Sequence, residues 1–380
     1  MTPLNVTICG GGRTGHLNAV LFSRQPGVRV SWLTSNPAVV GGAAGGIVAR
    51  LPDGSALPGE PAQVGTDPAS AVRHADVVVI TVPADARAAV LRAVGPHLRR
   101  DRPVYVGAIP GFCGFDWLAA DILANRPNAV IWGLKDVPHT AFDLVPGRSV
   151  RMGGAKQRLH AATHRRESRE ARAELAAHLG RLFEAPVEML QDYLEITLTP
   201  GNPIMHSAVV YGLVGPYGQW RDRTLPEDFC WWTDCPELGA YFLERCDAEN
   251  QALRRAAAGH FGIDLSSVKP LGTEIIEAYG DQIADTATML TILRTNRAYA
   301  GIRAPLVYDP AAGGFVLDRT SRAFREDVVY GLGLLVRMAA GLSVPAPYLD
   351  EIHRWALGYM GGVVGEPLSY LPRAWPGAAQ

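Results

Sequence analysis

The chain has 380 residues, more than the roughly 250–300 at which a single hydrophobic core stops growing, so two domains are expected. With 48% hydrophobic and 19% charged residues, the composition excludes an intrinsically disordered protein. The 36 basic and 37 acidic residues leave a net charge of −1, which argues against a nucleic-acid-binding protein held by phosphate contacts.

The cysteines and the apolar segments bear on the compartment. The five cysteines are scattered and form no CxxC pair, which is typical of a reducing environment. The first residues lead directly into a strand pattern, without the features of a signal peptide. The apolar segment 328–344 contains Arg337 and is shorter than a membrane-spanning helix. We therefore expect a cytoplasmic protein that does not bind membranes.

The first half of the chain alternates between strand and helix patterns. Such alternation predicts an α/β domain with a mostly parallel sheet, assigned to residues 1–190. A hairpin over 46–64, with its turn at Pro52-Asp53-Gly54, interrupts the alternation. The expected strands are 4–10, 28–33, 76–82, 104–108 and 129–133, and the expected helices are 14–23, 84–98 and 115–124.

The second half has helical periods and almost no strand pattern. Just before it, one long charged helix is expected over 156–184, with an apolar stripe at Leu175, Leu179, Leu182 and Phe183. A small hairpin at 305–317 is the exception to the helical pattern. We expect residues 191–380 to form an all-α domain.

The strongest local motif is Gly10-Gly11-Gly12-Arg13-Thr14-Gly15, a G-x-G-x-x-G between an expected strand and an expected helix. Glycines at this place permit a tight turn and a close approach of the backbone to a pyrophosphate. The helix N-terminus adds N–H donors. The motif therefore predicts a dinucleotide-binding Rossmann domain.

The end of the second strand leaves the choice of dinucleotide open. An Asp or Glu is expected there for a ribose 2′-hydroxyl, but the chain reads Thr34-Ser35-Asn36 and has no acidic residue before Asp53. No arginine follows the strand until Arg50, so a 2′-phosphate has no obvious partner either. The cofactor is expected to be NAD or NADP.

Two ionisable residues stand beside apolar helical segments. His206 opens one such segment and is a candidate for a substrate cleft, although a histidine packed in the core fits the spacing equally well. Asp327 precedes another segment, where it can simply cap the helix.

Other pairs have simpler interpretations. His160 and His164 have the spacing of a metal pair but no third ligand, which favours a solvated helix face, and no metal is expected. Cys230 and Cys235, beside Trp231-Trp232, are interpreted as packing residues.

Several motifs in one order resemble the opine dehydrogenases, the octopine/nopaline dehydrogenase family, over essentially the whole chain. Two features depart from the family pattern: Ser207 stands where the family usually has proline, and Trp231-Trp232 is not a feature of the family. The matching segments are Cys9-Gly10-Gly11-Gly12 with Gly15-His16, Val82-Pro83-Ala84, Asn202-Pro203-Ile204-Met205-His206 with Tyr211-Gly212, residues 243–256, residues 261–268, and Arg322 followed by Glu326-Asp327-Val328-Val329-Tyr330-Gly331-Leu332.

The resemblance implies a Rossmann domain followed by a helical domain, with the active site between them. The implied reaction is the NAD(P)H-dependent condensation of an amino acid α-amine with an α-keto acid. His206 and Asp327 would form the catalytic pair, and Arg322 would hold a substrate carboxylate. The resemblance further implies Asn202 and Thr140 as substrate-binding residues, and Val82, Pro83, Thr34, Ser35 and Asn36 as neighbours of the cofactor.

Two alternatives remain. A dehydrogenase of a hydroxy acid or sugar acid on a related fold would use Lys135, at a strand end, as its acid–base group. A non-catalytic dinucleotide-sensing protein would keep the fold alone, although both His206 and Asp327 are present. The two substrates and the oligomeric state stay open, a homodimer being one option.

Overall fold

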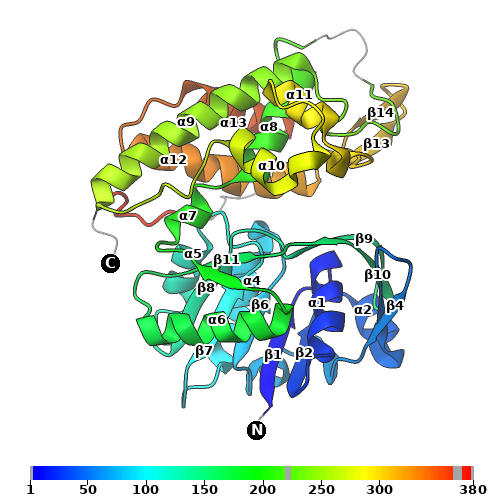
Figure 1. Ribbon diagram of the computed structural model, residues 1–380, viewed down its shortest axis with the longest axis vertical. Coiled ribbons are helices and arrows are strands. Elements are labelled where there is room, and N and C mark those ends of the chain that lie inside the picture. The colour runs from blue at the N-terminus through cyan, green and yellow to red at the C-terminus, as the bar shows by residue number, and fades with distance from the viewer. Residues whose placement is uncertain (1–2, 219–223, 363–369, 378–380) are drawn as a thin grey trace. The chain divides into compact units, whose positions relative to one another are not determined.

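The computed structural model describes residues 3–218, 224–362 and 370–377 (Figure 1). The chain forms two compact units, Met1–Thr197 and Leu198–Gln380. The division falls at the end of the short helix α7 (Leu194–Thr197), later than the boundary after residue 190 expected from the sequence.

The first unit is built on an eight-stranded sheet with the order β12-β11-β8-β7-β6-β1-β2-β5. β11 runs antiparallel to β8, and the other neighbouring strands are parallel. The mostly parallel sheet predicted from the sequence is therefore confirmed. The strands are β1 (Leu4–Cys9), β2 (Val28–Leu33), β5 (Gln63–Gly65), β6 (Val77–Ile80), β7 (Val104–Ala108), β8 (Ala129–Leu134), β11 (Leu159–Thr163) and β12 (Val187–Met189).

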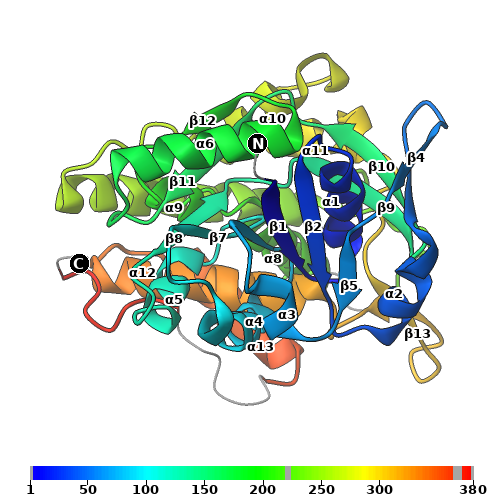
Figure 2. The same ribbon diagram turned by 90° about the horizontal axis from the view of Figure 1, so that it is seen from below.

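Helices cover both faces of this sheet (Figure 2). Strands covered on both faces read as continuous apolar runs, which explains the buried Val77–Ile80 segment of β6. One face carries α1 (Arg13–Ser23) and α6 (Arg169–Phe183), and the other carries α3 (Pro68–Val72), α4 (Ala84–Val94) and α5 (Phe115–Ile122).

A second, four-stranded sheet with the order β4-β3-β10-β9 belongs to the same unit. The expected hairpin is confirmed, because β3 (Ile47–Arg50) and β4 (Ala56–Gly59) pair antiparallel. Its expected end at Val64 is wrong, since that residue lies in β5 of the main sheet. β10 (Ser149–Ala155) pairs with β3 and with β9 (His139–Val145), and α2 (Pro37–Gly42) precedes β3.

The register of the parallel strands brings three loops to one edge. Cys9, the last residue of β1, is paired with Leu33 of β2 and with Ile80 of β6. The segments that follow these strands therefore leave the sheet side by side, where ligands of open α/β sheets bind.

The expected long helix over 156–184 is wrong in its first part. The structure has strand β11 at Leu159–Thr163, and the helix α6 begins only after Ser168, whose hydroxyl accepts a hydrogen bond from the Ala171 amide. β11 pairs with β8 and β12, contacts between distant segments that local helical periodicity does not reveal. His164 is consequently buried, and burial lowers its pKa to about 4, so it does not belong to a solvated helix face.

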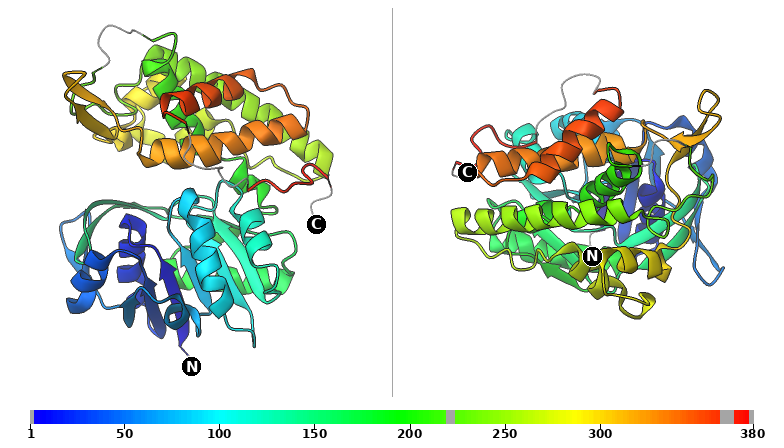
Figure 3. Two further views of the ribbon diagram at one scale, coloured as in Figure 1. Left: turned by 180° about the vertical axis from the view of Figure 1, so that it is seen from behind. Right: turned by 90° about the horizontal axis from the view of Figure 1, so that it is seen from above.

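The second unit is helical, with the two-stranded hairpin that the sequence predicts. Helix α8 packs against α9, α13 and a π-helix, and α9 is the long yellow-green helix in Figure 3. The elements are α8 (Gly201–Val214), α9 (Glu237–Phe261), α10 (Leu271–Tyr279), α11 (Met289–Thr295), β13 (Leu306–Asp309), β14 (Gly314–Leu317), the π-helix Ala323–Leu332, α12 (Gly333–Gly341) and α13 (Pro347–Tyr359). Short 3-10 turns occur at Gly280–Gln282 and Arg297–Tyr299 in this unit, and at Ala43–Gly45 and Gly95–His97 in the first unit.

Asp116 of α5 is a buried carboxyl in the first unit. Burial raises the pKa of Asp116 to about 8, and the neighbouring carboxylate of Asp192 acts in the same direction. Its Oδ1 has no hydrogen-bond partner among the described residues. The folded chain therefore keeps this proton over a range in which the unfolded chain releases it, between about pH 4 and pH 8.

We expect Asp116→Asn to remove one source of pH-dependent instability. Between about pH 4 and pH 8 the unfolded wild-type chain binds fewer protons, so its stability falls as pH rises, by at most about 1.4 kcal/mol per pH unit for this group. The variant should gain stability over wild type as pH rises through this window, measured by urea unfolding at pH 5, 7 and 8.5. Asp121→Asn, an exposed residue of the same helix, is the control, and an equal gain in both variants would contradict the assignment.

Candidate active site

The glycine-rich loop joins β1 to α1 at the edge of the sheet. The N-terminal residue of α1 is preceded by Gly12, and no described side chain caps this helix end or places a carboxylate in its first turn. The first N–H groups of α1 are thus available to an anion. This is the arrangement that holds a dinucleotide pyrophosphate.

Three glycines of the loop have different reasons to be glycine. Gly10 has φ +136°, a backbone conformation that other residues rarely adopt, and a Cβ on Gly15 would lie 2.0 Å from the Gly10 carbonyl oxygen. Both are required by the fold itself. Gly12 has φ −84°, and a Cβ there would meet nothing within 4 Å. The protein's own packing leaves this space open, which fits a bound pyrophosphate.

A buried histidine, His16, stabilises the same loop. The Gly147 amide donates to its Nε2 at 2.7 Å, so the proton lies on Nδ1, which is 2.9 Å from the Gly12 carbonyl oxygen. Burial lowers the pKa of His16, consistent with a neutral ring. His16 therefore ties the turn between β9 and β10 to the loop, a role that its motif position did not reveal.

The residues after β2 shape the neighbouring part of this edge. Thr34 Oγ1 accepts from the Asn36 amide, and Asn36 Oδ1 accepts from the Ala38 amide as the N-cap of α2. Ser35 lies between them and is exposed. None of the three carries a charge, so this segment selects neither a 2′-hydroxyl by a carboxylate nor a 2′-phosphate by an arginine.

The loop after β6 is held by a residue that the sequence did not single out. Arg87 of α4 is 1% exposed, and its guanidinium donates to the carbonyl oxygens of Val82, Pro110 and Phe112. Pro83 is the N-cap of α4. Arg87 thus fixes the loops that follow β6 and β7, and no local pattern identifies it because its partners are backbone carbonyls of distant loops.

His206 and Asp327 meet in the second unit. His206 Nδ1 lies 2.8 Å from Asp327 Oδ2, across 121 positions of sequence. Asp327 is 1% exposed, whereas the His206 side chain is 16% exposed. Burial raises the pKa of Asp327, while the hydrogen bond and charge of His206 act in the opposite direction. The arrangement holds the imidazole by its Nδ1, and Nε2 is not part of this contact.

Neither residue stands at a helix start, so that expectation is wrong. His206 lies inside α8, which begins at Gly201, and Asp327 lies inside the π-helix Ala323–Leu332, which continues into α12. Asp327 therefore does not cap a helix. π-Helical turns occur often at functional sites, and this one buries Asp327 next to Glu326.

Arg322 lies one turn before these carboxylates. Its Nε donates to Glu326 Oε2, and Glu326 is 1% exposed while the Arg322 side chain is 52% exposed. Arg322 also lowers the pKa of Asp327 by its charge. The buried Glu326 anchors the arginine, whose side chain as a whole is half exposed.

Two tryptophans cover His206. The ring centre of Trp232 lies 5.2 Å from that of His206 with the planes 11° apart, and Trp231 lies at 5.1 Å and 37°. The sequence interpretation of this segment as packing missed the contact. Two consecutive tryptophans that the family pattern does not explain were the one feature of the sequence that could have indicated this contact with His206.

The structure places the other two expected substrate residues differently. Asn202 precedes His206 by one turn of α8 and is exposed on the same face. Thr140 belongs to β9 in the first unit, where its hydroxyl accepts from the Gly154 amide at 2.8 Å. The Thr140 hydroxyl therefore links β9 to β10 within the second sheet.

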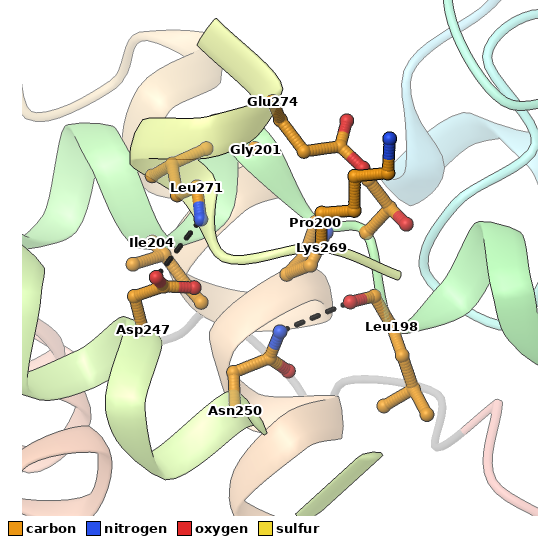
Figure 4. Close-up of a pocket in the computed structure, with 10 residues that line it drawn as sticks. Leu198, Pro200, Gly201, Ile204, Asp247, Asn250, Lys269, Leu271 and Glu274 are labelled. Carbon is orange, nitrogen blue, oxygen red and sulfur yellow. Dashed lines mark hydrogen bonds between the residues drawn. The ribbon is translucent and has the colours of Figure 1, made fainter. Parts of the chain in front are cut away.

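A small pocket lies at the start of α8 (Figure 4). Gly201 and Ile204 line it, and at about 100° per residue His206 points to the opposite side of the helix. The Asn250 amide donates to the Leu198 carbonyl there, and Asp247 accepts from the Leu271 amide. The pocket is thus separate from the His206–Asp327 pair.

The described residues contain neither a membrane-spanning helix nor a metal-binding cluster. No helix in the described ranges is long and apolar enough to cross a membrane. Within the same part of the chain, no group of three or more His, Cys, Asp or Glu side chains is arranged to hold a metal ion.

An α/β unit with a dinucleotide fingerprint, followed by a helical unit that carries a hydrogen-bonded His–Asp pair, defines the class of NAD(P)-dependent dehydrogenases. Residues 189–360 match the model of the NAD/NADP octopine/nopaline dehydrogenase alpha-helical domain. The chain belongs to this octopine/nopaline (opine) dehydrogenase family.

Similar proteins agree with this assignment. The chain is 56% identical to an uncharacterised protein, y4xO, of Sinorhizobium fredii, over 99% of this chain and 100% of that protein. It is 28% identical to the octopine dehydrogenase of Mizuhopecten yessoensis, over 95% and 91% of the two chains. The structure of an octopine dehydrogenase with NADH and L-arginine superposes with a TM-score of 0.81 at 25% identity, covering 94% of this chain and 90% of that one.

Proposed function

We propose that the protein catalyses the NAD(P)H-dependent reductive condensation of an amino acid α-amine with an α-keto acid, and the reverse reaction. The observation that carries the proposal is the contact between His206 and Asp327, 2.8 Å apart and 121 positions distant in sequence. A proton donor is needed when the carbinolamine loses water and when the imine is reduced. The octopine dehydrogenase of similar structure binds NADH and L-arginine, which supports the substrate class.

The cofactor would bind through the glycine-rich loop. The open space over Gly12 and the first N–H groups of α1 fit a pyrophosphate, with Arg13 and Thr14 opening the helix and Gly11 in the turn. When bound, the nicotinamide supplies the hydride for reduction.

His206 would exchange the proton through Nε2. Its Nδ1–H donates to Asp327, which fixes the tautomer and stabilises the imidazolium when Nε2 is protonated. The protonated ring gives its proton in the condensing direction, and the neutral ring accepts one in the oxidative direction. The pair therefore serves both directions of the reaction.

Arg322 would bind a substrate carboxylate. Glu326 fixes the guanidinium through Nε, and the Arg322 side chain is 52% exposed. An arginine held in this way offers a planar fork of donors that matches a carboxylate better than a lysine would. Asn202, exposed one turn before His206, is a further candidate for substrate contact.

We expect Arg322→Ala to weaken apparent substrate affinity by roughly 10–150-fold, since a hydrogen bond to a charged group is worth about 1.5–3 kcal/mol. Cofactor affinity should be nearly unchanged. Steady-state KM values for the amino acid and the keto acid measure the effect, with the exposed neighbour Arg325→Ala as the control. Equal losses for both substrates together with a lowered Tm would identify a structural arginine instead.

The proposed function is tested by assaying each of a set of amino acids in combination with pyruvate, 2-oxoglutarate, oxaloacetate or glyoxylate. The oxidation of NADH and of NADPH is followed in separate assays. At least one pair should be consumed only when both substrates are present. Oxidation of the cofactor by a keto acid alone would favour the hydroxy-acid dehydrogenase alternative, in which Lys135→Ala rather than His206→Ala stops turnover. Cofactor binding without any turnover would favour the dinucleotide-sensing alternative.

A further inference from the structure

Trp231 and Trp232 form a wall of indole rings against His206. Trp232 lies nearly parallel to the imidazole, with ring centres 5.2 Å apart and planes 11° apart, in the offset stack that aromatic pairs prefer. Trp231 makes a tilted contact at 5.1 Å and 37°. Both tryptophans are buried, at 3% and 4% exposure, so the contact is shielded from water.

Hydrogen bonds hold the backbone around the indole wall. The Trp231 amide donates to the Ile302 carbonyl at 3.0 Å, and the Cys235 amide donates to the Trp232 carbonyl at 3.2 Å. Asp234 Oδ2 accepts from the Cys230 amide at 2.7 Å. Trp232 also packs against Tyr299, with ring centres 5.8 Å apart. The fold therefore sets the positions of both indole rings.

Asp327 and Trp232 constrain the imidazole in complementary ways. The hydrogen bond to Asp327 holds one edge of the ring but allows the ring to rock about that bond. A parallel indole removes this freedom, since rocking would separate the stacked faces. The indole face also attracts a cation, and tryptophan does so more strongly than tyrosine or phenylalanine.

We propose that Trp232 is a positioning residue for His206, one that fixes the plane of the imidazole and stabilises its protonated form. The proposal deepens the proposed function and rests on it for the role of His206. Trp232 itself does not exchange a proton or contact the reacting atoms in this proposal. Its contribution is to direct Nε2 and to favour the ring state that gives a proton.

Several charged groups of the described residues lie near the pair or on the helices that pack against α8. Asp327 is the direct partner of the imidazole, and Glu326 and Arg322 influence Asp327 through their charges. Helix α13, which also packs against α8, directs Glu351 at the hydroxyl of Tyr211, further along α8. On α9, Asp247 accepts from the Leu271 amide at the pocket on the far side of α8. A substitution of Trp232 changes none of these groups.

The direct test is an NMR titration of His206 in protein labelled with ¹³C-histidine, with the resonance assigned by its loss in His206→Gln. Trp232→Leu keeps the site apolar but removes the indole face. The titration midpoint of His206 should move to lower pH by about 0.5–1.5 units, and by less in Trp232→Phe, which retains an aromatic face. Trp355→Leu is the matched control, because Trp355 stacks on Tyr359 and not on His206.

Kinetics provide the second readout. In Trp232→Leu, kcat should fall more than either substrate KM rises, and the alkaline limb of the pH–rate profile should move with the NMR midpoint. Trp232→Phe should recover part of both effects. If Trp232→Leu does not fold, Trp232→Phe alone still tests the proposal, because the His206 midpoint should move to lower pH in that variant too.

The outcomes separate this inference from the proposed function. An unchanged His206 midpoint in both Trp232 variants, or an equal shift in Trp355→Leu, would overturn the inference even if the wild type condenses its substrates. A shift confined to the Trp232 variants would support it even if no amino acid and keto acid pair is turned over, in which case the proposed function alone would fail.

Discussion

His206→Ala should lose about 10²–10⁴-fold in kcat while it retains NAD(P)H binding, because removal of a general acid–base group typically costs that factor. In the condensing direction the wild-type rate should fall as pH rises and the imidazole loses its proton. This limb of the pH–rate profile should disappear in the variant. Stopped-flow turnover and fluorescence titration of NAD(P)H measure the two properties separately.

Asp327→Asn should lose much of the same factor, since an amide permits the wrong tautomer of His206 and no longer stabilises the imidazolium. The double variant should be little worse than His206→Ala, because residues that act as one unit are not additive. His260→Ala, an exposed histidine at the end of α9, is the control and should keep full turnover.

Two results would contradict the pair. Losses that multiply in the double variant would show that His206 and Asp327 act independently. Full turnover in His206→Ala, with none in Lys135→Ala, would transfer the acid–base role to the lysine after β8.

Gly12→Val should abolish NAD(P)H binding without unfolding the protein. Gly12 has an ordinary φ of −84° and open space around its Cβ position, so the fold itself tolerates a side chain there. The valine would occupy the space through which the backbone approaches the pyrophosphate. Isothermal titration calorimetry with NADH and NADPH measures the loss, and far-UV circular dichroism checks the fold.

The control for this prediction is Gly259→Val in α9, another glycine whose Cβ position has no neighbour within 4 Å. That variant should bind the cofactor as wild type does. Unchanged affinity in a folded Gly12→Val protein would remove the loop from the cofactor site. Gly15→Val would not serve, since a Cβ there lies 2.0 Å from the Gly10 carbonyl oxygen and the fold itself would suffer.

The sequence by itself determined the α/β alternation of the first unit. β2 and β7 have the bounds predicted for them, and every residue of β7 is buried, as expected of a strand covered on both faces. The glycine loop was equally readable, since each of its conformational demands falls on a local residue. The His206–Asp327 pair was proposed only through the resemblance to a family, because periodicity alone fitted a core histidine and a helix cap.

Long-range contacts decided the features that the sequence did not reveal. β11 is a strand because β8 and β12 offer it backbone partners, although its flanks carry a charged, helix-like pattern. The π-helix that buries Glu326 and Asp327 depends on packing against α8, which no local propensity encodes. The stack of Trp232 on His206 and the carbonyl contacts of Arg87 join segments far apart in the chain. Only the folded structure specifies such contacts, since their free energy comes from groups that meet after the chain has folded.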